Sequence, residues 1–372
     1  MAKLKEEYLM KRLLSTMLTV ILMLSLIGCG ETKSTSPSDL KAENNLVGVA
    51  MPTQSLQRWD GDGRNMKNQL EAKGYTVDLQ YANNDINTQI QEIENMITKK
   101  CKVLVVAAID GATLTNVIKT AKENGIKVIA YDRLIMQTSN VDYYATFDNF
   151  KVGVIQGKYI ETKLGLKEGK GPFNIELFGG SPDDNNATFF FKGAMSILKP
   201  YIDKGKLVIP SKQKNFTTIA IQSWDSAKAQ GRMDNLITST YAKGTKLDVI
   251  LSPNDSLAIG IVASLKNAGY GTADKPFPVL TGQDCDKPNI MAIINDKQSM
   301  SVFKDTRKLA TKVVEMVSSI LQGKKAEVND IKTYNNGSVI VPSYLCDPVY
   351  VEKTNYKKIL VDSGYYKEAE LK

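Results

Sequence analysis

From Leu46 onward, short runs of apolar residues alternate with longer amphipathic stretches of mixed apolar and polar residues. Short runs rich in Val, Ile and other apolar residues predict buried strands. These runs are Leu46–Met51, Thr76–Tyr81, Val103–Ala108, Val128–Tyr131, Tyr143–Thr146, Phe173–Phe178, Leu207–Ile209, Val249–Ser252 and Val279–Gly282. Longer amphipathic stretches between the runs predict helices. These stretches include Asp60–Lys73, Asn87–Lys99, Gly111–Asn124, Phe150–Leu164, Ala187–Leu198, Ala227–Tyr241, Leu257–Asn267 and Thr306–Leu321.

This alternation of strands and helices predicts the fold class. Near-continuous apolar strands are typical of parallel sheets that are covered by helices on both faces. Several predicted helices are followed by glycine, as at Gly74, Gly125 and Gly269, where a left-handed C-terminal cap is favoured. We therefore expect an α/β protein built from doubly wound, Rossmann-like parallel sheets.

The amino-terminal segment has the pattern of an export signal. Lys11 and Arg12 precede an apolar run that is too short to span a bilayer comfortably. The run ends in Leu26-Ile27-Gly28-Cys29, which resembles the lipobox of bacterial lipoproteins. The resemblance implies that residues 1–28 are removed and that Cys29 is acylated. An ordinary apolar segment that ends in Gly-Cys by chance is the alternative.

The residues that follow the predicted lipidation site are polar and carry no core-forming pattern. We expect residues 29–45 to form a flexible tether, because Ser, Thr, Lys and Pro dominate them. Two acyl chains on Cys29 would anchor the protein durably to a membrane. The mature chain would keep about 340 residues, which is enough for two domains.

The composition excludes several kinds of catalytic and metal site. The chain contains no His, which removes Ser-His-Asp and Cys-His nucleophiles and His-ligated zinc together. Besides Cys29 there are Cys101, Cys285 and Cys346, an odd number without a close pair. This spacing is neither a disulfide framework nor a metal knuckle. We expect no cofactor and no metal ion.

The charge pattern argues against nucleic-acid binding. Residues 1–28 contain four of the 48 Lys and Arg residues and two of the 40 Asp and Glu residues, so the mature chain has a net charge of +6. The Lys residues are scattered among Asp and Glu and form no run that could follow a phosphate backbone. A solvated, lysine-rich surface is the simpler interpretation.

Polar side chains follow nearly every predicted strand. Parallel sheets bind their ligands at the carboxyl ends of the strands, so these positions are candidates before any function is considered. Loops are polar in general, which explains part of the pattern. The general polarity of loops explains less well why Arg and Trp are adjacent in one loop and why Asp and Arg are adjacent in another. The candidate segments are Pro52 to Ser55 with Arg58-Trp59, Ile109-Asp110-Gly111, Asp132-Arg133, Asp148-Asn149, Gly179 to Asn186, Pro253-Asn254-Asp255 and Gln283-Asp284.

Such a set of side chains suits a sugar. Carboxylates accept hydroxyl protons, Arg, Lys and Asn donate to hydroxyl oxygens, and charge-assisted bonds are the stronger kind. Trp59 and Trp224 could cover the apolar faces of a pyranose, although burial in a core is the alternative for each indole. An affinity near 1 μM corresponds to about −0.7 kcal/mol for each of about twelve heavy atoms, which is well toward the maximum for small ligands. Such efficient binding requires almost complete burial of the sugar, so two lobes must close over it.

Several longer stretches resemble the type I periplasmic sugar-binding proteins of ABC transporters, in the xylose-binding and multiple-sugar-binding group. The resemblance covers about residues 47–372. Its most specific stretches are Arg58-Trp59, Asp85 to Met96, Ile129 to Ile135, Tyr143 to Asn149, Asn174 to Ala187, Gly282-Gln283-Asp284 and Phe303 to Thr306. It implies two parallel-sheet lobes that are joined by a hinge with three chain crossings, near Asp148, Lys304 and Glu327. The first lobe would comprise residues 46–148 and 304–327, and the second residues 149–303 and 328–372.

The resemblance also assigns roles to single residues. It implies that Trp59 and Trp224 stack on the sugar. The expected hydrogen-bonding set is Arg58, Asp132, Arg133, Asn186, Asn254, Asp284 and Lys304. Asp148 and Asn149 could either contact the sugar or brace the hinge.

The resemblance implies a binding protein and not an enzyme. We expect a monomeric lipoprotein on the extracytoplasmic face of the cell membrane that captures a monosaccharide of the xylose, glucose, galactose or arabinose class and delivers it to an ABC permease. The alternative is a sugar-sensing partner in chemotaxis or two-component signalling.

Two other functions are set aside. A glycosidase needs a carboxylic acid and a carboxylate, but Asp183-Asp184 is typical of a helix N-terminus. Arg58, Arg133 and Lys304 would keep nearby carboxylates ionised. A repressor of this fold needs a DNA-binding head, whereas the first 45 residues hold a signal and a tether.

Overall fold

A computed structural model describes residues 45–371 of the chain. The predictions of a signal peptide, of acylation at Cys29 and of the tether up to residue 44 lie outside the described residues. Within residues 45–371, none of the helices has the length and apolar character needed to cross a membrane.

The first sheet is parallel throughout and has six strands in the order β11-β5-β4-β3-β1-β2. The strands are β1 (Leu46–Met51), β2 (Thr76–Tyr81), β3 (Val103–Val106), β4 (Lys127–Tyr131), β5 (Tyr143–Phe147) and β11 (Ser343–Cys346). Four helices accompany them, namely α2 (Gln57–Ala72), α3 (Ile86–Thr98), α4 (Thr115–Glu123) and α11 (Thr306–Leu321).

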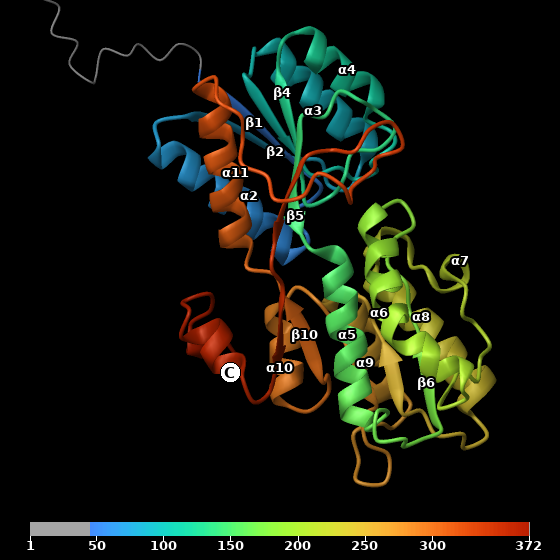
Figure 1. Cartoon of the computed structure of the whole chain (residues 1–372). Coiled ribbons are helices and arrows are strands. Elements are labelled where there is room, and N and C mark those ends of the chain that lie inside the picture. Colours follow the sequence, from blue (N-terminus) through green and yellow to red (C-terminus); the bar gives the residue numbers. More distant parts are fainter. Residues whose placement is uncertain (1–44, 372) are drawn as a thin grey trace, which may run out of the picture. The chain divides into compact units, whose positions relative to one another are not determined.

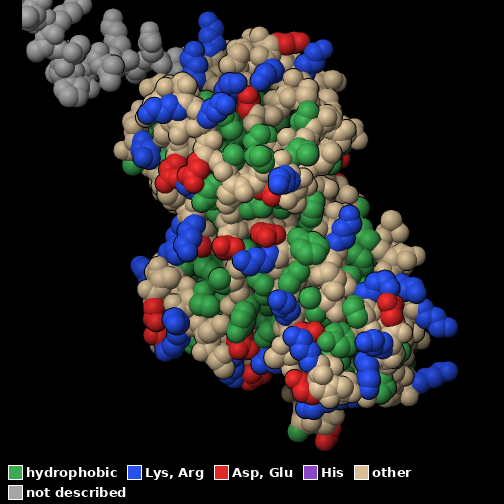
Figure 2. Space-filling model, viewed as in Figure 1, with side chains coloured by type: hydrophobic (Ala, Val, Ile, Leu, Met, Phe, Trp, Pro, Cys, Tyr) green, Lys and Arg blue, Asp and Glu red, His purple; other side chains and the backbone are tan. Residues whose placement is uncertain are grey.

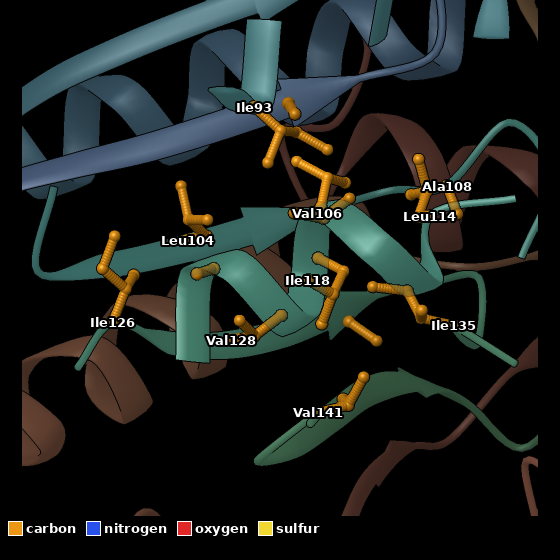
Figure 3. Close-up of a cluster of buried hydrophobic side chains, with 14 of the residues drawn as sticks. Ile93, Leu104, Val106, Ala108, Leu114, Ile118, Ile126, Val128, Ile135 and Val141 are labelled. Atoms are coloured by element: carbon orange, nitrogen blue, oxygen red, sulfur yellow. The ribbon is translucent and has the colours of Figure 1, made fainter. Parts of the chain in front are cut away.

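The inner strands of the first sheet are buried on both faces, which explains why β1, β3 and β4 are near-continuous apolar runs. The edge strand β2 alternates polar and apolar residues and is only partly buried. Val103 and Val105 of β3 pack with α2 and α11, whereas Leu104 and Val106 pack with α3 and α4. Figure 1 shows the two helix pairs on opposite faces of the sheet. Figure 3 shows the core on the α3 and α4 face, where Ile118 lies among side chains of β3 and β4.

The second lobe contains a four-stranded parallel sheet in the order β7-β6-β8-β9 and an antiparallel pair, β10 and β12. The strands are β6 (Phe173–Leu177), β7 (Leu207–Val208), β8 (Val249–Leu251), β9 (Val279–Leu280), β10 (Met300–Phe303) and β12 (Val349–Glu352). The helices are α5 (Asn149–Leu164), α6 (Asn185–Asp203), α7 (Phe216–Ile219), α8 (Ser226–Leu236), α9 (Asp255–Asn267) and α10 (Lys287–Ile294). Short helical turns span Gln222–Trp224, Ile237–Tyr241, Lys357–Val361 and Glu368–Leu371.

The residues of β8 alternate between two cores in the same way. Val249 and Leu251 pack with α5 and α6, and Ile250 packs with α8 and α9. The α/β fold with two parallel-sheet lobes is therefore confirmed.

All the predicted strands and helices are present, with ends that differ by a few residues. The strands β10, β11 and β12 and the helices α7 and α10 were not predicted. Each is short, and the three strands gain their partners from distant parts of the chain.

The chain passes between the lobes three times, and the third passage differs from the expectation. The passages follow β5, β10 and β11 (Figure 1). Residues 328–346 were expected in the second lobe, but Ser343–Cys346 pairs with β5 in the first sheet. Tyr334 and Val341 also pack in the first-lobe core. This segment therefore belongs to the first lobe, because its apolar residues cover the edge that β5 would otherwise leave open.

Candidate functional site

One pocket brings together all nine residues that the sequence nominated. Arg58, Trp59, Asp132, Arg133, Asn186, Trp224, Asn254, Asp284 and Lys304 line it. The lining comes from both lobes, and the empty space is about 450 Å³ including the opening to solvent. Because the lining comes from both lobes, a molecule that is held here contacts both lobes at once.

The topology explains why these residues meet. Arg58 and Trp59 begin α2 after β1, Asp132 and Arg133 follow β4 directly, and Asn254 follows β8. Asp284 and Lys304 follow β9 and β10. The carboxyl ends of the strands in the two lobes thus supply opposite walls of one pocket.

Several pocket residues have unusual backbone conformations. The φ angles of Asp132, Trp224 and Asp284 are 57°, 54° and 97°, and that of Cys285 is 55°. A left-handed conformation of a non-glycine residue costs roughly 1–2 kcal/mol and is often found at functional sites. Asp132, Trp224 and Asp284 thus place their side chains in the pocket at the expense of local backbone stability, whereas Cys285 lies in a neighbouring core.

Arg58 lies at the centre of a charge cluster that spans the lobes. Its Nη2 donates to Oδ2 of Asp132, and its Nη1 lies 3.4 Å from Oδ1 of Asp284. Lys304 Nζ lies 3.0 Å from the same Asp284 oxygen. Burial acts to raise the pKa of Asp132, but Arg58, Lys304 and Arg133 outweigh it and lower the pKa of Asp132 below its usual value. Asp132 is therefore ionised and ready to accept hydrogen bonds.

Arg133 is fixed from two directions. Its Nη1 donates to the carbonyl oxygens of Ala108 and Ile109 at 3.1 and 3.2 Å, just beyond the end of β3. Its Nε lies 3.1 Å from Oδ2 of Asp184 in the other lobe. These contacts hold the guanidinium at the pocket wall.

Asp184 combines the expected cap with a role that the sequence did not reveal. Its Oδ1 accepts from the backbone N–H of Asn186 at the start of α6, as predicted for a helix N-terminus. Its Oδ2 faces Arg133 and also accepts from Trp224 Nε1 at 3.2 Å. Asp184 thus joins a charged side chain of the first lobe to an indole of the second.

Both indoles have the core burial that was the alternative to stacking on a sugar. Trp59 and Trp224 are buried in the cores of the first and second lobes, and each also lines the pocket. The guanidinium carbons of Arg58 and Arg133 lie 4.7 and 5.1 Å from the centre of the Trp59 ring. The indoles are therefore rigid parts of the pocket wall and contribute apolar area to it.

A glycine makes room for Trp224. A Cβ atom at Gly180 would lie 2.0 Å from Cη2 of the indole, far below van der Waals contact. Any other residue at position 180 would displace the ring, because Trp224 packs against Phe190 and the rest of the second-lobe core.

Asn186 and Asn254 make structural hydrogen bonds as well as lining the pocket. Asn186 Nδ2 donates to the carbonyl oxygen of Asp132, and its Oδ1 accepts from Tyr144 and Asn149. Asn254 Oδ1 accepts from Leu257 N at the start of α9. Asn186 therefore joins the lobes near the hinge, and the Asn254 cap leaves the amide NH₂ group of that residue for other contacts.

Asp148 and Asn149 lie at the first crossing and do not line the pocket. Asp148 caps α5 by accepting from Lys151 N, and Asn149 is fully buried and contacts Asn186. Of the two roles left open for this pair, the geometry supports bracing of the hinge.

Six further residues line the pocket outside the expected sugar-binding set, and two of them, Asp184 and Gln283, lie in the candidate segments at strand ends. They are Leu56, Asp184, Phe190, Ser256, Gln283 and Asp286. Gln283 and Asp286 flank the Asp284-Cys285 pair, and Phe190 lies one helical turn after Asn186. Extending the strand-end rule along each loop and one turn into each helix would have found most of them.

Basic neighbours do not lower the pKa of every carboxylate that lines the pocket. Burial raises the pKa of Asp184, and Arg133 compensates only in part. Burial raises the pKa of Asp286 to about 7, with Asp284 adding to the rise and Arg58 and Lys304 opposing it. Desolvation outweighs the attraction of the basic groups at these two positions.

Charges are mixed on the molecular face in Figure 2, where Lys and Arg side chains are interspersed with Asp and Glu. Among residues 45–371, no three His, Cys, Asp or Glu side chains are grouped so that they could hold a metal ion. The pocket itself offers hydrogen-bonding groups, charges of both signs and aromatic rings to a ligand.

Comparisons with known proteins agree with this picture. A family model of the periplasmic binding protein domain matches residues 47–325. The chain is 57% identical over 331 residues to the multiple sugar-binding periplasmic receptor ChvE of Rhizobium radiobacter, which covers 89% of this chain and 93% of the relative. It is 38% identical over 347 residues to a D-xylose-binding periplasmic protein of Haemophilus influenzae, which covers 92% of this chain and 96% of the relative.

A solved structure is similar over most of the chain. It is an ABC transporter solute-binding protein from Clostridium phytofermentans with bound β-D-glucose. The sequence identity is 55% and the TM-score is 0.85. The match covers 88% of this chain and 100% of that one.

Proposed function

The chain belongs to the periplasmic binding protein family, in the multiple-sugar- and xylose-binding group, and on that premise we propose that the pocket between its lobes captures one monosaccharide. The protein is an extracytoplasmic solute-binding protein of an ABC sugar transport system and not an enzyme. The observation that supports the proposed site most strongly is the meeting of nine residues from separate loops in one pocket. We propose an aldopyranose of the xylose, glucose, galactose or arabinose class as the ligand.

The balance of charge suits a neutral polyol. Arg58 is in contact with Asp132 and Asp284, Lys304 with Asp284, and Arg133 with Asp184. A sugar hydroxyl both donates and accepts, so it can enter such a pair and satisfy both partners. Trp59 and Trp224 would then cover the C–H faces of the ring and exclude water.

Capture of the ligand would close the lobes. Arg58 contacts Asp284, and Arg133 contacts Asp184, across the boundary between the lobes. A sugar held between these groups makes its full set of contacts only in the closed arrangement, so it stabilises that arrangement. Both walls come from one chain, which is consistent with a monomer.

A titration with a panel of monosaccharides tests the proposal. At a ligand concentration 1,000-fold above the dissociation constant, we expect the free energy of unfolding to increase by about 4 kcal/mol. The measurement is the melting temperature of the chain without residues 1–28 and with Cys29→Ser, together with calorimetric heat. No shift and no heat with any pentose or hexose would refute the proposal.

We also propose that Cys29 carries the lipid anchor and that the closed, loaded protein docks on an ABC permease in the membrane. The order of charge, apolar run, small residue and cysteine in residues 11–29 supports the anchor. Cys29→Ser should release the protein from the membrane fraction of expressing cells. Unchanged membrane association would contradict the anchor and leave the sugar site unaffected.

A further inference from the structure

A carboxylate lies behind the central arginine of the pocket, on the same helix. Asp62 is one turn after Arg58 in α2, and its Oδ2 lies 3.5 Å from Arg58 Nε. Asp62 is completely buried and does not line the pocket. No role follows from the sequence alone, where the residue is part of an unremarkable Gly-Asp-Gly triplet inside a helix.

A buried carboxylate without strong hydrogen bonds is costly to keep. Neither oxygen of Asp62 has a hydrogen-bond partner of normal geometry, and the same holds for Nε of Arg58. Burial raises the pKa of Asp62 to about 6, although Arg58 and the hydroxyls of Tyr131 and Thr306 oppose the rise. A well-packed apolar side chain at this position would commonly stabilise the fold by more. The aspartate is therefore better explained by what it does to Arg58.

Each nitrogen of the Arg58 guanidinium faces a different carboxylate. Nη2 donates to Asp132 of its own lobe, Nη1 faces Asp284 of the other lobe, and Nε faces Asp62. Asp132 and Asp284 line the pocket, so a bound sugar competes with them for the guanidinium. Asp62 lies outside the pocket lining and is not displaced when the sugar enters.

We infer that Asp62 is a positioning residue for sugar recognition, which holds the Arg58 guanidinium in the orientation that the ligand meets. The inference rests on the proposed use of Arg58 as a sugar ligand. Asp284 belongs to the other lobe, so its hold on the guanidinium is lost when the lobes open, and Asp132 lies in the pocket, where the sugar competes with it. Asp62 shares the helix with Arg58, so its hold does not change with the lobes.

The test is a double-mutant cycle on the full chain. Asp62→Asn keeps the shape of the side chain and removes its charge, and Arg58→Gln removes the guanidinium. We expect Asp62→Asn to weaken binding of the preferred monosaccharide about tenfold in the presence of Arg58, and less than about twofold in the Arg58→Gln background. Asp62→Ser, which is smaller, replaces Asp62→Asn if that variant does not fold.

The same helix offers a matched control. Asp60 pairs with Arg64 at 2.5 Å with the same spacing along the helix, and Arg64 is largely exposed. Asp60→Asn therefore removes a similar charge pair and should leave the affinity unchanged. Equal losses in Asp60→Asn and Asp62→Asn would overturn the inference.

A panel of deoxy sugars separates positioning from a general structural effect. If Asp62 acts through Arg58, Asp62→Asn and Arg58→Gln will lose discrimination at the same hydroxyl position. Uniform weakening for all sugars, additive losses in the cycle, or wild-type affinity in Asp62→Asn would each overturn the inference. If Arg58→Gln itself leaves affinity unchanged, the proposed pocket fails, and the inference fails with it.

Discussion

Charged side chains in the pocket are held by other protein groups before any ligand arrives. Arg133 is bonded to two backbone carbonyl oxygens and paired with Asp184, and Asp132 is bonded to Arg58. Such prior ordering reduces the entropy that is lost when the ligand binds. Truncation of one partner also leaves the other buried without its counter-charge.

We therefore expect Asp132→Ala and Arg133→Ala each to weaken sugar binding by at least about 30-fold, because removal of one partner of a buried charge pair commonly costs 2–5 kcal/mol. Calorimetric titration measures the effect, and circular dichroism checks the fold. Asp347→Ala is the control, because Asp347 is largely exposed and pairs with Lys151 away from the pocket. Folded variants with unchanged affinity would contradict the proposed pocket.

Asp286 should make stability depend on pH. Its pKa of about 7 in the folded protein lies above the usual aspartate value of about 3.9, so the folded state binds more protons between these values. The stabilisation is complete below pH 4 and is lost as pH rises through 7. Relative to Asp286→Asn, the wild type should therefore lose melting temperature between pH 5 and 8. Asp274→Asn, on an exposed loop outside the pocket, should show no such difference.

At the residue scale, the sequence predicted which residues line the pocket better than it predicted their burial and their ionic partners. Arg58, Asp132 and Asp284 could be predicted because strand ends and family resemblance both depend on local sequence. The role of Asp184 between the lobes could not, because its partner Arg133 comes from another lobe. The burial of Asp62 was equally hidden, because it depends on the packing of β4 and α11 against α2.

At the scale of elements, the loops that follow the strands contain most of the pocket residues, and hydrogen bonds to the next helix fix the end of each loop. Asp184, Asn254 and Asp305 all cap the helix that follows them, so the loop ends where a backbone N–H group needs a partner. The predicted strands were found because their apolar runs are long and local. The strand β11 was missed because its partner β5 lies about 200 residues earlier in the chain.

Substitution of Gly180 tests whether sugar binding depends on the position of the Trp224 indole. Gly180→Ala would place a Cβ atom 2.0 Å from Trp224 Cη2, so the indole must move by roughly 1.5 Å to regain contact distance. We expect sugar affinity to fall about tenfold and the free energy of unfolding to fall by about 1–3 kcal/mol. The control is Gly231→Ala in α8, where a Cβ atom would meet nothing within 4 Å. Wild-type affinity in Gly180→Ala would show that the Trp224 position does not matter.

At the scale of the whole molecule, the carboxyl-terminal segment joins the lobes beside the pocket. Tyr366 packs in the core around α10, donates to the carbonyl oxygen of Cys285 and accepts from Gln57 Nε2 of the first lobe. Arg307 at the start of α11 also donates to the carbonyl oxygen of Ser363. These contacts stabilise the closed arrangement without lining the pocket.

Tyr366→Phe should weaken sugar binding about fivefold and do so through faster release, because one hydrogen bond contributes about 1 kcal/mol. Stopped-flow measurement of the dissociation rate tests this. Tyr356→Phe, in the same segment but outside the bridge between the lobes, is the control. An unchanged dissociation rate in Tyr366→Phe would show that the bridge does not hold the lobes together.

The position of β11 has a consequence for how the protein is made. The first sheet begins with Leu46 but needs Ser343–Cys346 to cover β5. A nascent chain that has not yet been synthesised to residue 343 therefore carries an unprotected sheet edge, of the kind that invites pairing with other chains. The sheet of the amino-terminal lobe is therefore complete only when residues 343–346 are available to pair with β5.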